Sequence, residues 1–173
     1  MKWLLTPVLL LIQSCILLTG CETGSTGDGE VELYLMEYYE TVGGGSEIST
    51  SSVVVKETPL IPYDDFISYN SDDHIFLITD EAKEAVQSLQ HSVRGVAFAV
   101  TAGREIVYTG YFWPSYSSLG CNWVVIDPLM IFGDYELRVR LGYPGVVEGS
   151  DIPDRRNDRR ILGPFRRDGK LVE

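Results

Sequence analysis

The sequence predicts an α+β fold: a single small domain with a mainly antiparallel sheet, one amphipathic helix packed on one face of the sheet, and a short C-terminal helix. Several short segments alternate apolar and polar residues, which is typical of strands. One segment, residues 79–89, has apolar residues at helical spacing. The order strand, helix, hairpin and further strands favours an antiparallel sheet with a helix laid on it.

The N-terminal part of the domain contains two expected strands. Residues 31–39 alternate with a period of two, so this strand has one apolar face. Residues 41–52 are rich in glycine and serine and predict a mobile loop. The β-branched run 53–55 predicts a second, short strand that Pro59 ends.

The central part predicts a strand, a helix and a hairpin. The apolar run 75–78 suits a buried strand, and Thr79 then offers a side-chain oxygen as helix N-cap. Ala82, Ala85, Val86 and Leu89 lie at i, i+3, i+4 and i+7 and form the apolar face of that helix. The hairpin is predicted from two apolar runs that flank Gly103, namely residues 96–100 and 106–113.

The C-terminal part adds two strands and an Arg-rich segment. Residues 122–126 and 135–141 predict strands, and the second alternates as expected of a sheet with one wet face. Residues 152–173 predict a short helix that starts near Pro153, breaks at Gly163-Pro164 and is followed by a frayed tail. We therefore expect residues 31–173 to form a single domain.

The first twenty residues predict a secretory signal rather than part of the fold. Lys2 supplies a positive start, residues 3–18 are mostly apolar, and small residues follow at the end. The alternative is a retained transmembrane helix, which Pro7 and the polar pair at 13–14 disfavour.

Leu18-Thr19-Gly20-Cys21 resembles the lipobox of bacterial lipoproteins. The resemblance implies a diacylglycerol on the Cys21 sulfur, cleavage before this residue, and usually a further acyl chain on the new amino terminus. Each buried methylene contributes about 0.8 kcal/mol, so two or three chains make a stable membrane anchor. Residues 21–30 would then be a flexible tether. Glu22 does not match the aspartate that in some enterobacteria retains lipoproteins in the inner membrane, which favours the outer membrane and leaves its face open.

Residues 74–113 are similar to the first periplasmic head region of the SecDF translocation proteins. The similarity lies in a strand that enters a helix with an acidic start, residues 76–82, and in a hairpin with the small turn Ala102-Gly103-Arg104. It implies a strand–helix–hairpin fold for this part. It does not imply translocation, because the transmembrane helices of those proteins have no counterpart here.

Cysteine use and charge limit the function classes. Cys15 leaves with the signal and Cys21 takes lipid, so Cys121 has no partner for an internal disulfide and the domain must rely on its apolar core. Residues 21–150 carry 20 acidic and 6 basic side chains, whereas residues 151–173 carry 5 and 7. An acidic body repels phosphate backbones, so we expect no nucleic-acid partner.

The most unusual stretch for binding is aromatic. Tyr111, Trp113 and Tyr116 follow one another around Pro114 and could form a stacking platform for a sugar or a peptide. The alternative is that Phe112 and Trp113 pack the sheet and the serines that follow form a loop.

No catalytic or metal constellation is predicted, and no cofactor. Cys121 could pair with His74 or His91 as a thiol nucleophile, but no spacing enforces this. The carboxylates at 64–65 and 72–73 lack a calcium-loop pattern. We expect a non-enzymatic envelope lipoprotein that is held to the lipid bilayer through Cys21, and whose domain either binds an envelope protein or glycan or has a structural role. A glycan- or peptide-binding module and a thiol enzyme are the alternatives.

Overall fold

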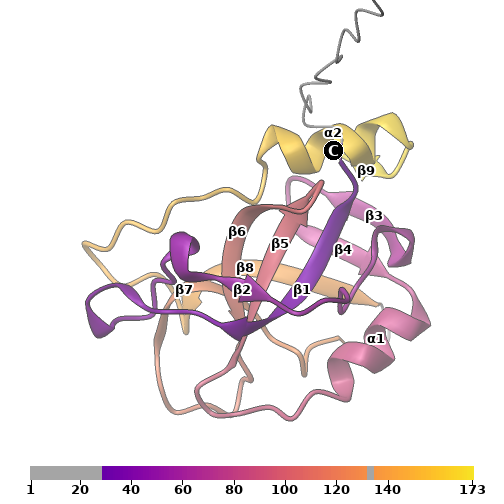
Figure 1. Ribbon diagram of the computed structural model, residues 1–173. Coiled ribbons are helices and arrows are strands. Elements are labelled where there is room, and N and C mark those ends of the chain that lie inside the picture. Colours follow the sequence, from indigo (N-terminus) through magenta and orange to yellow (C-terminus); the bar gives the residue numbers. More distant parts are fainter. Residues whose placement is uncertain (1–28, 132–134) are drawn as a thin grey trace, which may run out of the picture.

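The computed structural model describes residues 29–131 and 135–173. The strands of these residues form one sheet in the order β2-β1-β5-β6-β7-β8-β4-β3-β9, which confirms the predicted α+β class (Figure 1). The expected signal, the lipobox and residues 21–28 of the expected tether lie outside the described residues. The strands are β1 (Val31–Tyr38), β2 (Val54–Val55), β3 (Phe66–Asn70), β4 (Ile75–Ile78), β5 (Val96–Ala102), β6 (Glu105–Phe112), β7 (Cys121–Ile126), β8 (Glu136–Tyr143) and β9 (Leu171–Val172).

Pairing within the sheet is mainly antiparallel. Among the described strands, β6 pairs in parallel with β7 and β3 with β9, and the other neighbours are antiparallel. The two outermost strands, β2 and β9, are each only two residues long. Strands β3 and β9 were not expected from the sequence.

The helix α1 (Asp80–Gln87) confirms the predicted amphipathic helix. Its N-cap is Thr79, whose hydroxyl accepts a hydrogen bond from the Ala82 backbone N–H at 3.3 Å. Ala82 and Val86 are fully buried and fix the helix to the apolar core. This is the N-terminal signal and apolar stripe expected of a helix laid on a sheet.

The C-terminal helix differs from the prediction. The helix α2 (Arg159–Arg167) begins later than Pro153 and continues through Gly163-Pro164, and the expected frayed tail is strand β9. Proline removes one intrahelical hydrogen bond. Ile161 and Phe165, on the same helix as Pro164, are fully buried. Their apolar contacts offset the lost hydrogen bond and keep the segment helical.

The larger of two apolar clusters is formed by buried side chains of the sheet together with those of α1 and α2. The Phe165 ring contacts the rings of Tyr63, Phe66, Tyr69 and Phe76 at centroid distances of 5.5–6.0 Å. In the middle of β6, a Cβ on Gly110 would lie 2.6 Å from Phe98 Cζ and 2.7 Å from the Val124 carbonyl oxygen. Only glycine allows β6 and its neighbours to approach this closely.

Candidate functional site

A hollow lies beside the paired strands β6 and β7. Their parallel pairing consists of Tyr111 with Val125 and Phe112 with Ile126, at the C-terminal ends of both strands. The residues of β6 and β7 that precede these pairs, 107–109 and 123–124, line the hollow. The 3₁₀ helix η2 (Thr50–Ser52) lies against β6 at this point.

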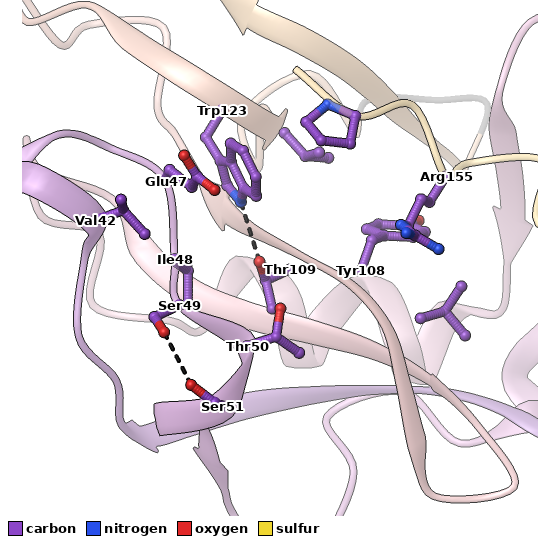
Figure 2. Close-up of a pocket in the computed structure, with 13 residues that line it drawn as sticks. Val42, Glu47, Ile48, Ser49, Thr50, Ser51, Tyr108, Thr109, Trp123 and Arg155 are labelled. Carbon is purple, nitrogen blue, oxygen red and sulfur yellow. Dashed lines mark hydrogen bonds between the residues drawn. The ribbon is translucent and has the colours of Figure 1, made fainter. Parts of the chain in front are cut away.

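We call this space the Trp123 hollow, and its volume is about 340 Å³ (Figure 2). Strands, the loop after β1 and the segment before α2 all contribute side chains to it. The lining residues are Val107, Tyr108 and Thr109 from β6, Trp123 and Val124 from β7, Val42 and residues 47–51 from the loop, and Pro153 and Arg155 from the C-terminal segment.

The Trp123 ring is held in one orientation. Its indole N–H donates to the Thr109 hydroxyl oxygen at 3.0 Å. These residues lie side by side because continuing the β6–β7 register by two residues brings Thr109 opposite Trp123. Thr109 is buried and Trp123 is only partly buried, so part of the ring stays accessible from the hollow. An oriented and accessible indole face can pack against a flat apolar face of a ligand.

The loop over residues 41–52 forms the polar wall of the hollow. Val42 N–H donates to the Glu47 carbonyl at 2.8 Å, and the Ser52 hydroxyl donates to the Ser49 carbonyl at 2.7 Å. The buried side chain of Ile48 fixes the loop to the smaller apolar cluster. The Gly- and Ser-rich loop predicted as mobile is thus held by hydrogen bonds and one apolar anchor.

The two charged side chains of the lining lie on opposite walls. Figure 2 shows Glu47 beside the Trp123 ring and Arg155 beside Tyr108. Glu47 is exposed and makes no ion pair or side-chain hydrogen bond within the described part of the chain. Arg155 makes an ion pair of 3.8 Å with Asp158. Glu47 is therefore free to meet a ligand, whereas Arg155 would have to share its guanidinium with Asp158.

A polar network supports the Arg155 wall from behind. The Arg156 guanidinium donates to the Val139 carbonyl at 3.0 Å and to Asp154 Oδ2 at 2.7 Å. The hydrogen bonds from Arg156 lower the pKa of Asp154 to about 2. Arg156 is held to β8 by its hydrogen bond to the Val139 carbonyl. The neighbouring Arg155 is therefore held at the edge of the hollow.

Two buried tyrosines lie near the segment before α2: the hydroxyl of one is hydrogen-bonded and that of the other is not. The Tyr69 hydroxyl lies 2.9 Å from the Arg156 carbonyl oxygen and 3.0 Å from Asn157 Oδ1. The Tyr108 hydroxyl is fully buried and has no hydrogen-bond partner among the described residues. Burial raises the pKa of both phenols, so both stay neutral. Tyr108 thus carries an unsatisfied polar atom at the back of the hollow.

The predicted aromatic platform is divided in the structure. Tyr111 and Trp113 are only 4% and 6% exposed, and their rings pack edge to face at 6.0 Å. Tyr116 is 56% exposed and donates to the His91 carbonyl at 3.2 Å. Tyr111 and Trp113 line a second hollow, of about 490 Å³, to which Tyr116 does not contribute. Phe112 and Trp113 therefore pack the sheet, as in the alternative interpretation, and Tyr111 is buried with them. Ligand binding by this patch stays a prediction.

The geometry gives no support to a thiol nucleophile at Cys121. The side chain is 1% exposed, and burial raises the pKa of its thiol. The groups that affect this pKa through hydrogen bonds are Ser46 and the Trp123 backbone, and neither histidine is among them. Within residues 29–131 and 135–173, no group of three His, Cys, Asp or Glu side chains is placed to hold a metal ion.

The histidines predict how stability depends on pH. Burial lowers the pKa of His74 and His91 below the ordinary value of 6.5. The unfolded chain then takes up protons that the folded chain does not, so we expect the free energy of unfolding to fall as pH drops from about 7 to about 5. Hydrogen bonds from arginine lower the pKa of Asp154 and Asp158 to about 2, which adds a further loss between about pH 4 and pH 2.

Urea unfolding at a series of pH values measures this dependence. His91→Phe removes an imidazole whose two nitrogens are buried without partners in the described structure, so it should flatten the curve between about pH 7 and pH 5. A midpoint that rises on acidification would contradict the assignment.

The residues of the Trp123 hollow were not identified from the sequence. Trp123 was expected only as part of a strand, and Glu47 only as part of a loop. No local pattern could reveal them, because the hollow joins Glu47, Thr109, Trp123 and Arg155 from four separate parts of the chain.

In the described part of the chain, neither helix is long and apolar enough to cross a membrane. The resemblances to the lipobox and to the SecDF head region stay predictions. Comparison of the chain with models of protein families, with curated proteins and with solved structures found no match.

Proposed function

We propose that this protein is an envelope lipoprotein, anchored to the outer membrane through acylated Cys21, whose domain binds a small polar ligand in the Trp123 hollow without reacting with it. The observation that carries the binding role is the hollow itself. An oriented indole, several hydroxyls, one carboxylate and one guanidinium converge on about 340 Å³. Concave sites with an aromatic surface and a few convergent polar groups are typical of ligand binding.

The anchor is supported by the lipobox-like Leu18-Thr19-Gly20-Cys21 after an apolar leader. A domain held at a membrane by a tether is suited to capture a ligand there. The role as a binding protein, rather than an enzyme, is supported by a lining made of groups that hydrogen-bond or stack.

The anchor predicts the outcome of a single substitution. Cys21→Ser removes the sulfur that would carry diacylglycerol, so the protein should move from the membrane fraction to the soluble fraction of cells. Fractionation and mass spectrometry of the mature chain measure this. Cys15→Ser and Cys121→Ser are matched controls, since one cysteine precedes the expected cleavage point and the other is buried in the domain. An unmodified thiol on Cys21, or an intact Met1, would contradict the anchor.

A second candidate site is the hollow at Tyr111 and Trp113. Tyr39 packs edge to face on Tyr111 at 6.0 Å, and Arg94 lines the rim. This hollow favours the alternative of a glycan- or peptide-binding patch. A glycan and peptide array probed with the chain and with its Arg94→Ala variant tests it, and binding unchanged by this substitution would argue against the patch.

A further inference from the structure

We propose that the ligand of the Trp123 hollow is a neutral saccharide of one or two rings. This inference rests on the proposed binding function and deepens it, since it assigns the chemical class of the ligand. Three properties of the lining carry it: an oriented aromatic face, a set of hydroxyl groups, and charges of opposite sign that balance.

The aromatic face suits the apolar side of a sugar ring. The Trp123 indole N–H is already bonded to Thr109, so the ring offers its flat surface rather than its donor to a ligand. A pyranose has a face of C–H groups that packs on such a surface, while its hydroxyls extend outward around the ring edge. An indole fixed by a hydrogen bond loses little freedom when the sugar arrives.

The polar groups suit the hydroxyls of a sugar. Ser49 and Ser51 can each donate and accept, Glu47 accepts only, and Arg155 donates only. The Ser49 and Ser51 hydroxyls hydrogen-bond to each other at 3.1 Å, oxygen to oxygen, which leaves one O–H and free lone pairs for a ligand. A pair of hydroxyls at this spacing matches neighbouring hydroxyls on a sugar, each of which also donates and accepts. Glu47 can accept from two such hydroxyls at once, because an ionised carboxylate has two acceptor oxygens.

Charge and size favour a neutral, small ligand. The lining contains one acidic and one basic side chain, so it does not select strongly for either sign. Residues 31–150, which form most of the domain, are acidic and disfavour anions. A volume of about 340 Å³ lies at the small end of the range of roughly 300–1,000 Å³ that is typical of small-molecule sites.

A peptide is the competing ligand class. One recurring mode of peptide binding adds an extended peptide to a strand edge through backbone hydrogen bonds. Side-chain hydroxyls predominate among the polar groups of this hollow, and η2 lies against β6 where a strand would have to be added. These features favour the saccharide.

Titration of the purified full-length mature chain with defined probes tests the inference. The saccharide probes are glucose, galactose, N-acetylglucosamine and their β-linked disaccharides, and the peptide probes are short neutral peptides of two to four residues. Tryptophan fluorescence and calorimetry report binding. We expect at least one saccharide to bind and the peptides not to bind.

Variants assign the binding to the hollow. Glu47→Gln keeps the shape and removes the charge, so the affinity for the bound saccharide should fall about tenfold, as expected for the loss of a charge-assisted hydrogen bond. Trp123→Ala should abolish binding. Glu57→Gln is the matched control, because Glu57 is also exposed but does not line the hollow. The affinity of this variant for the saccharide should equal that of the parent. Glu47 is exposed, so we expect Glu47→Gln to fold. This variant therefore still tests whether the saccharide binds in the hollow if Trp123→Ala does not fold.

The outcomes separate this inference from the proposed function. Saccharide binding that Glu47→Gln weakens and Glu57→Gln leaves unchanged supports both. Peptide binding that depends on Glu47, without saccharide binding, overturns the saccharide and keeps the binding role of the hollow. Saccharide binding that neither Glu47→Gln nor Trp123→Ala weakens overturns the assignment to this hollow. Absence of binding by all probes overturns both proposals.

Discussion

Phe165→Ala is expected to lower the free energy of unfolding by about 3–5 kcal/mol, the usual cost of truncating a fully buried phenylalanine. The Phe165 ring is fully buried and contacts four other aromatic rings, so its removal leaves a cavity with little room to collapse. Small domains are stable by about 5–15 kcal/mol, so this loss is a large part of the total. Urea unfolding followed by circular dichroism measures it.

The effect should be specific to the buried ring. Ile67→Ala is the control, because Ile67 is 49% exposed on the neighbouring strand β3 and its truncation should cost well under half as much. Equal losses for the two variants would show that α2 is not fixed to the domain by Phe165.

Tyr69→Phe is expected to cost about 1–3 kcal/mol, whereas Tyr108→Phe should be neutral or stabilising. Both substitutions remove one hydroxyl from a buried ring and leave the ring in place. The Tyr69 hydroxyl is the hydrogen-bond partner of the Arg156 carbonyl and of Asn157, which would both lose it. The Tyr108 hydroxyl has no partner among the described residues, so its removal relieves an unsatisfied buried group.

The two variants can be compared directly, because each loses the same hydroxyl group from a buried ring. Thermal melting of both proteins at pH 7 measures the difference. If Tyr108→Phe is as destabilising as Tyr69→Phe, the Tyr108 hydroxyl has a partner that the structure does not show, such as a buried water.

Much of the fold follows from local sequence patterns. The period-two run of β1, the capped amphipathic helix α1 and the hairpin of β5 and β6 each lie within a few residues of their predicted bounds. Each of these elements is determined by the spacing of apolar residues and by the turn or cap residues next to them.

The parts that the sequence did not predict depend on distant residues. Strand β9 exists because Leu171 and Val172 pair with Tyr69 and Asn70, about a hundred residues earlier in the chain. The helix α2 passes through Pro164 because burial of its neighbours outweighs a local preference. The Trp123 hollow also depends on distant residues, because the parts of the chain that line it come together only when the sheet has formed.

The short outer strands have a consequence for copies of the protein that are crowded together. A sheet of this width would present two long rows of unpaired backbone groups if its borders were long and straight, and such borders recruit other chains into aggregates. Because β2 and β9 span only two residues each, they give a second molecule little to add onto. Copies of the domain at a high local concentration are thereby less prone to polymerise.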